Sequence, residues 1–470
     1  MGSECLPNYE SLGADAPEDL EVHVAADPAT TSAIPLPPDA LDFESELASR
    51  STQNPDPSVR AEVHSGDPLV LIYTSGTTGL PKAAKMSHLR FSMTGIGSQI
   101  AGFGRSDVMY CALPLYHSAG GGMAVSAVLR SGGTIALRRK FSASAFWKDV
   151  RQFEATAFQY IGEFCRYLVI QPQSDDDGAH AVEFAIGNGL RPDIWEEFQN
   201  RFRIPQVVEF YGATEGNVAM LNFDNKHGSC GKRPPAVVPQ PRLIRYDVES
   251  DTHVRDAGGL CIECAPDEVG ELVGEIPQKA DTLQGRFEGY TSKAETERKI
   301  LRDVRSKGDT WFRTGDLLRC DKQGYFYFVD RIGDTFRWKG ENVSTQEVAE
   351  AVGAYPGIQL VNVYGVELGA DGRAGMAAIV LDDPSRFDGK AFYELASSAL
   401  PGYAAPVFVR LQPEPEITGT FKLRKVDLQR EGYDSDAIED PLYVRDDSRR
   451  EYIELTPERL RAVKSGELRV

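Results

Sequence analysis

Apolar residues in this chain gather in short runs that alternate with amphipathic stretches. Runs such as Val108–Leu113 and Gly133–Leu137 predict strands, and stretches such as Ser144–Glu154 and Pro192–Phe202 predict helices. The apolar run Leu69–Tyr73 predicts a buried strand. Strands that alternate with helices are typical of a layered α/β domain.

The pattern changes twice further along the chain. Short glycine-rich runs predict a smaller antiparallel or barrel-like part, and the stretch beyond residue 330 predicts a separate α+β domain. The glycine-rich strands are expected at 258–262, 270–276 and 324–329. The later elements are expected at 347–354, 361–366, 374–381, 390–400 and 421–428.

We therefore expect an α/β protein with two domains and a lead-in. A large domain covers 67–330, and a small α+β domain covers 331–470, with a hinge at 330–334. Residues 1–66 are rich in proline and acidic side chains, with one strand-like patch at Leu20–Ala25. They predict a loop-rich lead-in.

Composition narrows the possible partners. The 470 residues carry a formal charge of −19, which argues against binding to nucleic acid. Seven cysteines are an odd number scattered along the chain, so we expect reduced thiols, and the pair Cys261 and Cys264 lacks a second pair for a zinc site.

No apolar run approaches the roughly 20 residues of a spanning helix. The chain reads as cytoplasmic, without an anchor or signal peptide.

The sequence TSGTTGLPK at 74–82 follows the first predicted strand and predicts a polyphosphate-binding loop. Its glycines allow backbone N–H groups to face an anion, its hydroxyls add donors, and its lysine adds positive charge. Leu80 and Pro81 separate the last glycine from the lysine, so this is not a Walker loop. The candidate phosphate-binding residues are Thr74, Ser75, Gly76, Thr77, Thr78, Gly79 and Lys82.

The sequence Tyr211-Gly212-Ala-Thr214-Glu215 follows the apolar run Val207–Phe210, which predicts a strand. Tyr211 could stack on a purine, Thr214 could bond a phosphate oxygen, and Glu215 could hold Mg²⁺. A structural turn without a ligand explains this pentapeptide equally well.

Three further loops carry candidate residues, each with an ordinary structural alternative. Gly187, Asn188 and Gly189 form a turn where backbone can approach a flat ligand, although such a turn is usually only a loop. Asp316, in Thr-Gly-Asp, could accept ribose hydroxyls or simply cap a turn. Lys422 lies in a glycine-containing loop, where most lysines are only solvated.

These motifs, in this order, resemble the adenylate-forming superfamily of acyl-CoA synthetases, luciferases and peptide-synthetase adenylation domains. The segments at 114–120, 140–147, 159–168 and 333–345 are similar in sequence to the fatty acid transport protein, or very-long-chain acyl-CoA synthetase, family. The resemblance covers about residues 67–445.

The resemblance implies an AMP-forming ligase that uses ATP, Mg²⁺ and coenzyme A. A long-chain or very-long-chain fatty acid would form an acyl-adenylate, and the thiol of coenzyme A would then displace AMP. Lys422, Thr214 and Glu215 would be catalytic, with Glu215 as the metal ligand. The loop at 74–82 would hold phosphates. Adenine would contact Gly187, Asn188, Gly189, Tyr211 and Gly212, and ribose would contact Asp316 and Arg331. His117 would lie at the acyl entrance, and coenzyme A would contact Trp338, Lys339 and Gly340.

The resemblance also implies association with the plasma membrane or endoplasmic reticulum and a role in fatty acid uptake. Only 73 residues precede Thr74, so we expect most of the family's N-terminal region to be missing. Sheet edges left uncovered in this way would favour a homo-oligomer. Two alternatives stay open: a truncated protein that binds nucleotide or fatty acid without turnover, and a ligase for another carboxylic acid.

Overall fold

The computed structural model describes residues 1–13, 16–17, 20–26, 36–37, 40–74, 82–233, 240–277, 286–369, 372–414, 425–434 and 438–470. The chain forms two compact units, Met1–His64 and Ser65–Val470. In the first unit the predicted strand-like patch forms β1 (Val22–Val24), which pairs in parallel with β2 (Ala40–Asp42). Leu6, Val22 and Val24 make a small apolar cluster there. The helices of this unit are α1 (Leu6–Glu10) and α2 (Phe43–Ala48).

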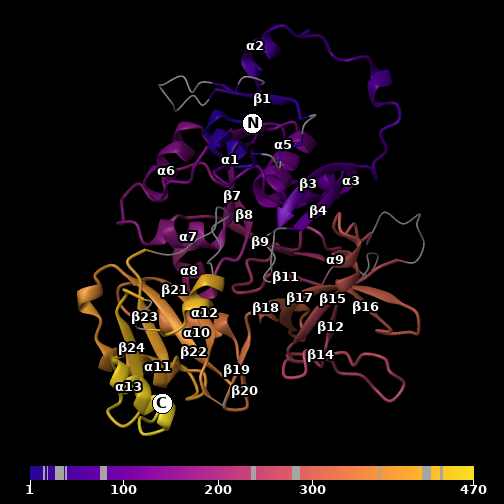
Figure 1. Cartoon of the computed structure of the whole chain (residues 1–470). Helices are drawn as coiled ribbons and strands as arrows, with labels where there is room; N and C mark the ends of the chain where they lie inside the picture. Colours follow the sequence, from indigo (N-terminus) through magenta and orange to yellow (C-terminus); the bar gives the residue numbers. More distant parts are fainter. Residues whose placement is uncertain are drawn as a thin grey trace. The chain divides into compact units, whose positions relative to one another are not determined.

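A large sheet organises the second unit, and its parallel part follows the predicted alternation of strands and helices (Figure 1). The parallel order is β9–β8–β7–β5–β6. Strands β5, β7 and β8 are buried along almost their whole length, as expected of parallel strands with both faces covered. Phe158 packs edge-on against Phe146 and Trp147 of one helix. The strands are β5 (Val108–Cys111), β6 (Thr134–Leu137), β7 (Ala157–Ile161), β8 (Phe184–Asn188) and β9 (Gln206–Gly212). The helices are α3 (His88–Thr94), α4 (Ile96–Ile100), α5 (Val125–Ser131), α6 (Ala143–Gln152), α7 (Gly162–Val169) and α8 (Pro192–Arg201), with the π-helix η4 (Ser118–Ala124) before α5.

The predicted antiparallel part continues the same sheet, because β10 pairs antiparallel with β9. Its order from there is β10–β11–β18–β17–β15–β12. The strands are β10 (Ala219–Asn222), β11 (Gly231–Lys232), β12 (Arg242–Ile244), β15 (Gly270–Glu275), β16 (Ile300–Arg302), β17 (Thr310–Cys320) and β18 (Tyr325–Arg331). Two short strands, β13 (Tyr246–Asp247) and β14 (Thr252–His253), pair with each other, and α9 (Lys293–Arg298) precedes β16.

The strand predicted at 258–262 was wrong. Within 258–262 the single β-bridge is an isolated one, which joins Cys261 to Arg255. Gly259 has a φ of +76°, and the carboxylate of Asp256 accepts hydrogen bonds from the N–H groups of Gly258 and Leu260. A turn closed by an aspartate therefore replaces the strand.

The prediction of a buried strand at Leu69–Tyr73 was also wrong in part. The strand forms as β3 (Pro68–Thr74), but Leu71 is 49% exposed and Tyr73 is 69% exposed. Its ladder partner is β4 (Lys82–Ser87), and these two strands form a separate antiparallel ribbon. Strand β3 therefore lacks the two covered faces of a strand inside the large sheet.

The chain beyond β18 builds its own sheet and core, drawn in orange to yellow in Figure 1. The sheet order is β21–β22–β23–β24–β25, with helices packed against it, which confirms the predicted α+β class. The boundaries 67–330 and 331–470 stay predictions. The elements are the hairpin β19 (Phe336–Trp338) and β20 (Glu341–Val343), the strands β21 (Ile358–Glu367), β22 (Arg373–Leu381), β23 (Phe408–Leu411), β24 (Leu442–Asp446) and β25 (Glu451–Glu454), and the helices α10 (Thr345–Gly353), α11 (Gly389–Ala399), α12 (Val426–Glu431) and α13 (Pro457–Ser465).

Candidate active site

A cavity of about 1790 Å³ lies among the ribbon β3–β4, the ends of β8 and β9, and the strands β17 and β18. It exceeds the 300–1,000 Å³ typical of a small-molecule pocket. The cavity brings together predicted residues from segments far apart in the sequence. Those that line it are Thr74, Lys82, His117, Asn188, Gly189, Tyr211, Gly212, Thr214, Glu215, Asp316 and Arg331.

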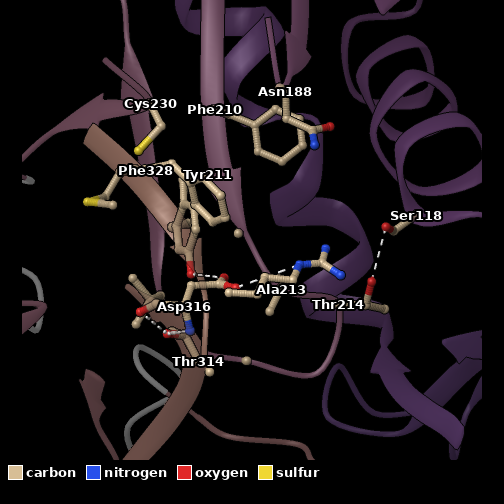
Figure 2. Close-up of a pocket in the computed structure, with 18 of the residues that line it drawn as sticks. Ser118, Asn188, Phe210, Tyr211, Ala213, Thr214, Cys230, Thr314, Asp316 and Phe328 are labelled. Atoms are coloured by element: carbon tan, nitrogen blue, oxygen red, sulfur yellow. Dashed lines mark hydrogen bonds and ion pairs between the residues drawn. The ribbon is translucent and has the colours of Figure 1, made fainter. Parts of the chain in front are cut away.

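Tyr211, Asp316 and Arg331 form one group at the side of the antiparallel strands. The phenol of Tyr211 donates a hydrogen bond of 2.5 Å to Oδ2 of Asp316 (Figure 2). Asp316 faces Arg331 across the β17–β18 ladder, with 3.9 Å between Oδ1 and Nε. Burial raises the pKa of Asp316, while the charge of Arg331 and the bond from Tyr211 act in the opposite direction. This arrangement presents a carboxylate and a guanidinium to the cavity.

The TGD turn that carries Asp316 rests on Glu271 of β15, a fully buried residue. Oε1 of Glu271 accepts a hydrogen bond of 3.0 Å from the N–H of Gly315. His253 lies 2.6 Å from Oε2, and Arg313 donates to the same oxygen at 3.0 Å. Burial opposes ionisation, but the bond from His253 and the charge of Arg313 hold the pKa of Glu271 below its usual value. Glu271 is therefore a charged support beneath the TGD turn.

Thr214 and Glu215 follow β9 and are held by residues from other elements. The hydroxyl of Thr214 lies 3.1 Å from that of Ser118 at the start of η4 (Figure 2). Glu215 is 9% exposed, and its Oε1 accepts a hydrogen bond of 2.7 Å from the phenol of Tyr290. Nζ of Lys299 lies 3.9 Å from the same oxygen.

Oε2 of Glu215 accepts no hydrogen bond from a described residue. A single carboxylate on the cavity wall fits Mg²⁺, which proteins often bind with one or two carboxylates together with substrate phosphates. Within the described ranges, no group of three or more histidine, cysteine, aspartate or glutamate side chains is placed to hold a metal ion. All seven cysteines are free thiols.

The ends of the predicted phosphate loop face each other across the ribbon. Thr74 pairs with Lys82, and its hydroxyl donates a hydrogen bond of 3.3 Å to the Lys82 carbonyl. Nζ of Lys82 forms an ion pair with Glu295 of α9. The predicted residues Ser75, Gly76, Thr77, Thr78 and Gly79 lie outside the described residues, as does Lys422.

The predicted adenine loop at Gly187–Gly189 leaves β8 and fits tightly against its neighbours. A Cβ at Gly187 would lie 2.3 Å from the Tyr160 carbonyl oxygen, so only glycine fits without a shift. Gly189 has a φ of +81°. The carboxylate of Glu209, on β9, accepts hydrogen bonds from the Gly189 N–H and from the Tyr160 phenol. Burial raises the pKa of Glu209 to about 8.

His117 is the N-cap residue of η4, and its Nδ1 accepts a hydrogen bond of 3.3 Å from the N–H of Ala119. Apolar side chains from β4, α4, η4, β7 and β10 also line the cavity, among them Met86, Ile96, Met123, Ile161 and Leu221.

The residues predicted to contact coenzyme A do not line the cavity in this arrangement. Trp338 is 2% exposed and belongs to the core of the C-terminal part. Lys339 and Gly340 form the exposed turn of the β19–β20 hairpin, with φ values of +50° and +85°. Their role with coenzyme A stays a prediction.

The predicted hinge carries a polar network that sequence reasoning missed. Lys425 donates hydrogen bonds to Asp334 at 3.1 Å and to the Thr345 hydroxyl at 2.8 Å. Asp330 is buried and accepts bonds from the N–H and hydroxyl of Thr345. Other supporting residues that the sequence motifs did not single out are Ser118, Glu209, Glu271, Tyr290 and Lys299.

No helix in the described part of the chain is long and apolar enough to cross a membrane.

The fold is the adenylate-forming fold, which solved structures share. The anthranilate CoA ligase AuaEII, solved with anthranoyl-AMP, superimposes with a TM-score of 0.74 at 19% identity, covering 93% of this chain and 78% of that chain. ATP-bound MatB from Rhodopseudomonas palustris gives a TM-score of 0.66 at 23% identity, covering 79% of this chain and 69% of that chain. At these identities the likeness concerns the fold.

Comparison with known sequences identifies the family to which the chain belongs. The family described as AMP-binding enzyme matches residues 12–274. Long-chain fatty acid transport protein 6 of Mus musculus is 40% identical over 100% of this chain and 75% of its own length. Long-chain fatty acid transport protein 2 of Rattus norvegicus is 46% identical over 86% of this chain and 65% of its own length. The chain therefore belongs to the AMP-binding enzyme family, within the long-chain fatty acid transport protein branch, as the motifs predicted.

These matches also correct the predicted extent of similarity, 67–445, because they reach into the first 66 residues. The chain spans 65% of the rat protein and 60% of long-chain fatty acid transport protein 1 of Mus musculus.

Proposed function

We propose that this chain is an AMP-forming acid–thiol ligase that activates long-chain or very-long-chain fatty acids and couples that activation to their uptake. In the first step the fatty carboxylate attacks the α-phosphorus of ATP, and pyrophosphate leaves. In the second step the thiol of coenzyme A attacks the acyl carbonyl, and AMP leaves. The products are acyl-CoA, AMP and diphosphate.

The observation that carries this proposal is that polar and apolar side chains line one cavity. Thr214, Glu215 and the Asp316–Arg331 pair are among the polar residues. Met123 and Ile161 are among the apolar residues. A reaction that joins a fatty carboxylate to a nucleotide phosphate requires both kinds of surface.

The polar residues suit the parts of ATP. Asp316 accepts hydrogen bonds and Arg331 donates them, which matches the two hydroxyls of ribose. Thr214 offers a hydroxyl to the α-phosphate, and Lys82, at the end of the phosphate loop, supplies positive charge to the β- and γ-phosphates. Lys422, which we expect to reach the reacting carboxylate and α-phosphate, would stabilise the negative charge of the transition state.

Glu215 would hold Mg²⁺ through Oε2, which accepts no hydrogen bond within the described part of the chain, while Tyr290 bonds to Oε1. A magnesium ion supplies charge neutralisation on the phosphates as the bond to pyrophosphate breaks. Tyr290 and Lys299 keep the Glu215 side chain oriented toward the cavity.

Support for a fatty acid, rather than an aryl or amino acid, comes from the relatives, which are named long-chain fatty acid transport proteins. Their names also motivate the proposed coupling to uptake and a membrane-associated location.

The test is to incubate the purified chain with ATP, Mg²⁺, coenzyme A and acids from medium to very long chain, and to quantify AMP and thioester. We expect both products with long acids. Acids with an aryl ring or an amino group serve as controls. If the chain binds ATP but releases no AMP with any acid, it is a binding protein and the ligase assignment fails.

A further inference from the structure

Glu209 is a buried carboxylate that the proposed reaction does not use directly. It is 4% exposed and lies on β9, in register with Gly187 of β8. Its Oε1 accepts a hydrogen bond from the N–H of Gly189, and the N–H of Leu190 approaches the same oxygen at 3.3 Å. The phenol of Tyr160 donates to Oε2. One side chain therefore binds two consecutive backbone donors of the loop beside the cavity.

The surroundings of Glu209 contain no described lysine, arginine or histidine within ion-pair distance. The titratable groups that face it are Tyr160 on β7, Cys165 on α7 and Cys230 beside β11, and burial raises the pKa of each, which keeps them neutral. A carboxylate without a cation is costly to bury. An apolar side chain would avoid that cost but would leave the backbone donors of the loop unsatisfied.

The loop is also constrained from its other side. A Cβ on Gly162, the first residue of α7, would lie 1.6 Å from the carbonyl oxygen of Gly189. Asn188 and Gly189 both line the cavity, and Asn188 lies near Phe210, the residue after Glu209 (Figure 2). The loop is thus held between Glu209 and α7 where it lines the cavity.

We propose that Glu209 is a positioning residue that fixes the loop Gly187–Leu190 as a rigid edge for a purine base. The base would meet a loop whose conformation is set before binding, so less ordering entropy is lost when the nucleotide arrives. This inference rests on the proposed function, because it requires that the cavity takes a nucleotide.

The test compares AMP binding by calorimetry in the whole chain and two variants. Glu209→Asp withdraws the carboxylate by one methylene, so the AMP dissociation constant is expected to rise about tenfold. Glu209→Gln keeps an oxygen for the Gly189 N–H, while its amide can donate to the Tyr160 oxygen, so the rise is expected to stay within threefold. Affinity for a fluorescent fatty acid should change less than twofold in both.

A pH series separates positioning from a general role in stability. Ionised Glu209 makes charge-assisted bonds to the loop, which are stronger than bonds from the neutral acid. Between pH 7 and 9.5, above the second ionisation of phosphate near pH 6, AMP affinity of the wild-type chain is expected to rise about threefold. Glu209→Gln should show a flat profile.

The outcomes are distinguishable. If the wild-type chain binds AMP and both folded variants match its affinity and pH profile, the inference about Glu209 is overturned while the proposed function survives. If the wild-type chain binds neither AMP nor ATP, the proposed function itself fails. Should Glu209→Asp not fold, as judged by thermal melting, the comparison of pH profiles between wild type and Glu209→Gln decides the question.

Discussion

Replacing Gly162 with alanine is expected to displace the predicted adenine loop without removing any polar group. The new Cβ would lie 1.6 Å from the Gly189 carbonyl oxygen and 2.2 Å from its carbon. Both are backbone atoms, so no side-chain rotation relieves the clash. The Gly189 carbonyl must retreat by about 1.4 Å to reach the 3.0 Å below which Cβ contacts are essentially never seen. That movement would also break the hydrogen bond from Gly189 to Glu209.

The size of the effect follows from this displacement. Extra atoms in a packed interior cost about 1–3 kcal/mol of folding free energy. A misplacement of about 1 Å in a substrate-positioning group costs roughly 10²-fold in rate. We therefore expect Gly162→Ala to lower the rate of adenylation by about 10²-fold at subsaturating ATP and to lower the melting temperature by a few degrees.

The assay is pyrophosphate release with saturating fatty acid and titrated ATP, combined with thermal melting. Gly402→Ala makes the same chemical change where no atom lies within 4 Å of the new Cβ, and its rate should stay within twofold of wild type. A Gly162→Ala chain that melts like wild type and retains its apparent affinity for ATP would refute the reasoning.

Three further predictions concern other parts of the site. Lys422→Ala should slow adenylation by about 10²–10³-fold yet spare thioester formation from supplied acyl-adenylate, and equal loss of both half-reactions would contradict its proposed role. Gly97→Phe should shift the preference measured by kcat/KM toward shorter acids, because Gly97 lines the cavity and a Cβ there would already lie 3.0 Å from the Leu221 side chain. An unchanged preference would place the acyl chain elsewhere. The pKa of Glu271 is lower in the folded chain than its usual value of about 4.5. The stability that its charge supplies is therefore present above about pH 4.5 and is lost as the pH falls through the pKa of Glu271 in the folded chain. The difference in urea stability between wild type and Glu271→Gln should therefore narrow from pH 7 to pH 3.5, and a constant difference would contradict the assigned charge.

The sequence was sufficient to predict the elements that its local pattern determines. The runs at Val108–Leu113 and Val207–Phe210 form strands, since their apolar side chains are buried on both faces of the large sheet. Short contiguous motifs, in which glycine, aromatic and carboxylate side chains occur together, also predicted candidate residues such as Tyr211 and Glu215, and the structure places both on the cavity wall.

Features that depend on contacts between residues far apart in the sequence were not predicted. The exposure of β3 depends on the layers that surround it, which the run Leu69–Tyr73 does not encode. Glu271 bonds to Gly315, 44 residues away, and Tyr290 bonds to Glu215, 75 residues away. Glu209 did leave a signal, a lone charge inside the apolar run VVEF, but its partners became apparent only in three dimensions.

The segment between Glu288 and Glu295 links the two places expected to bind opposite ends of the phosphate chain. Tyr290 bridges to Ala84 of the ribbon and bonds to Glu215, while Glu295 pairs with Lys82. A shift of Glu215 on metal binding would therefore be transmitted to Lys82 through five residues of chain. Cation and triphosphate should consequently bind with positive cooperativity, and substitutions in this segment should weaken that cooperativity more than either affinity alone.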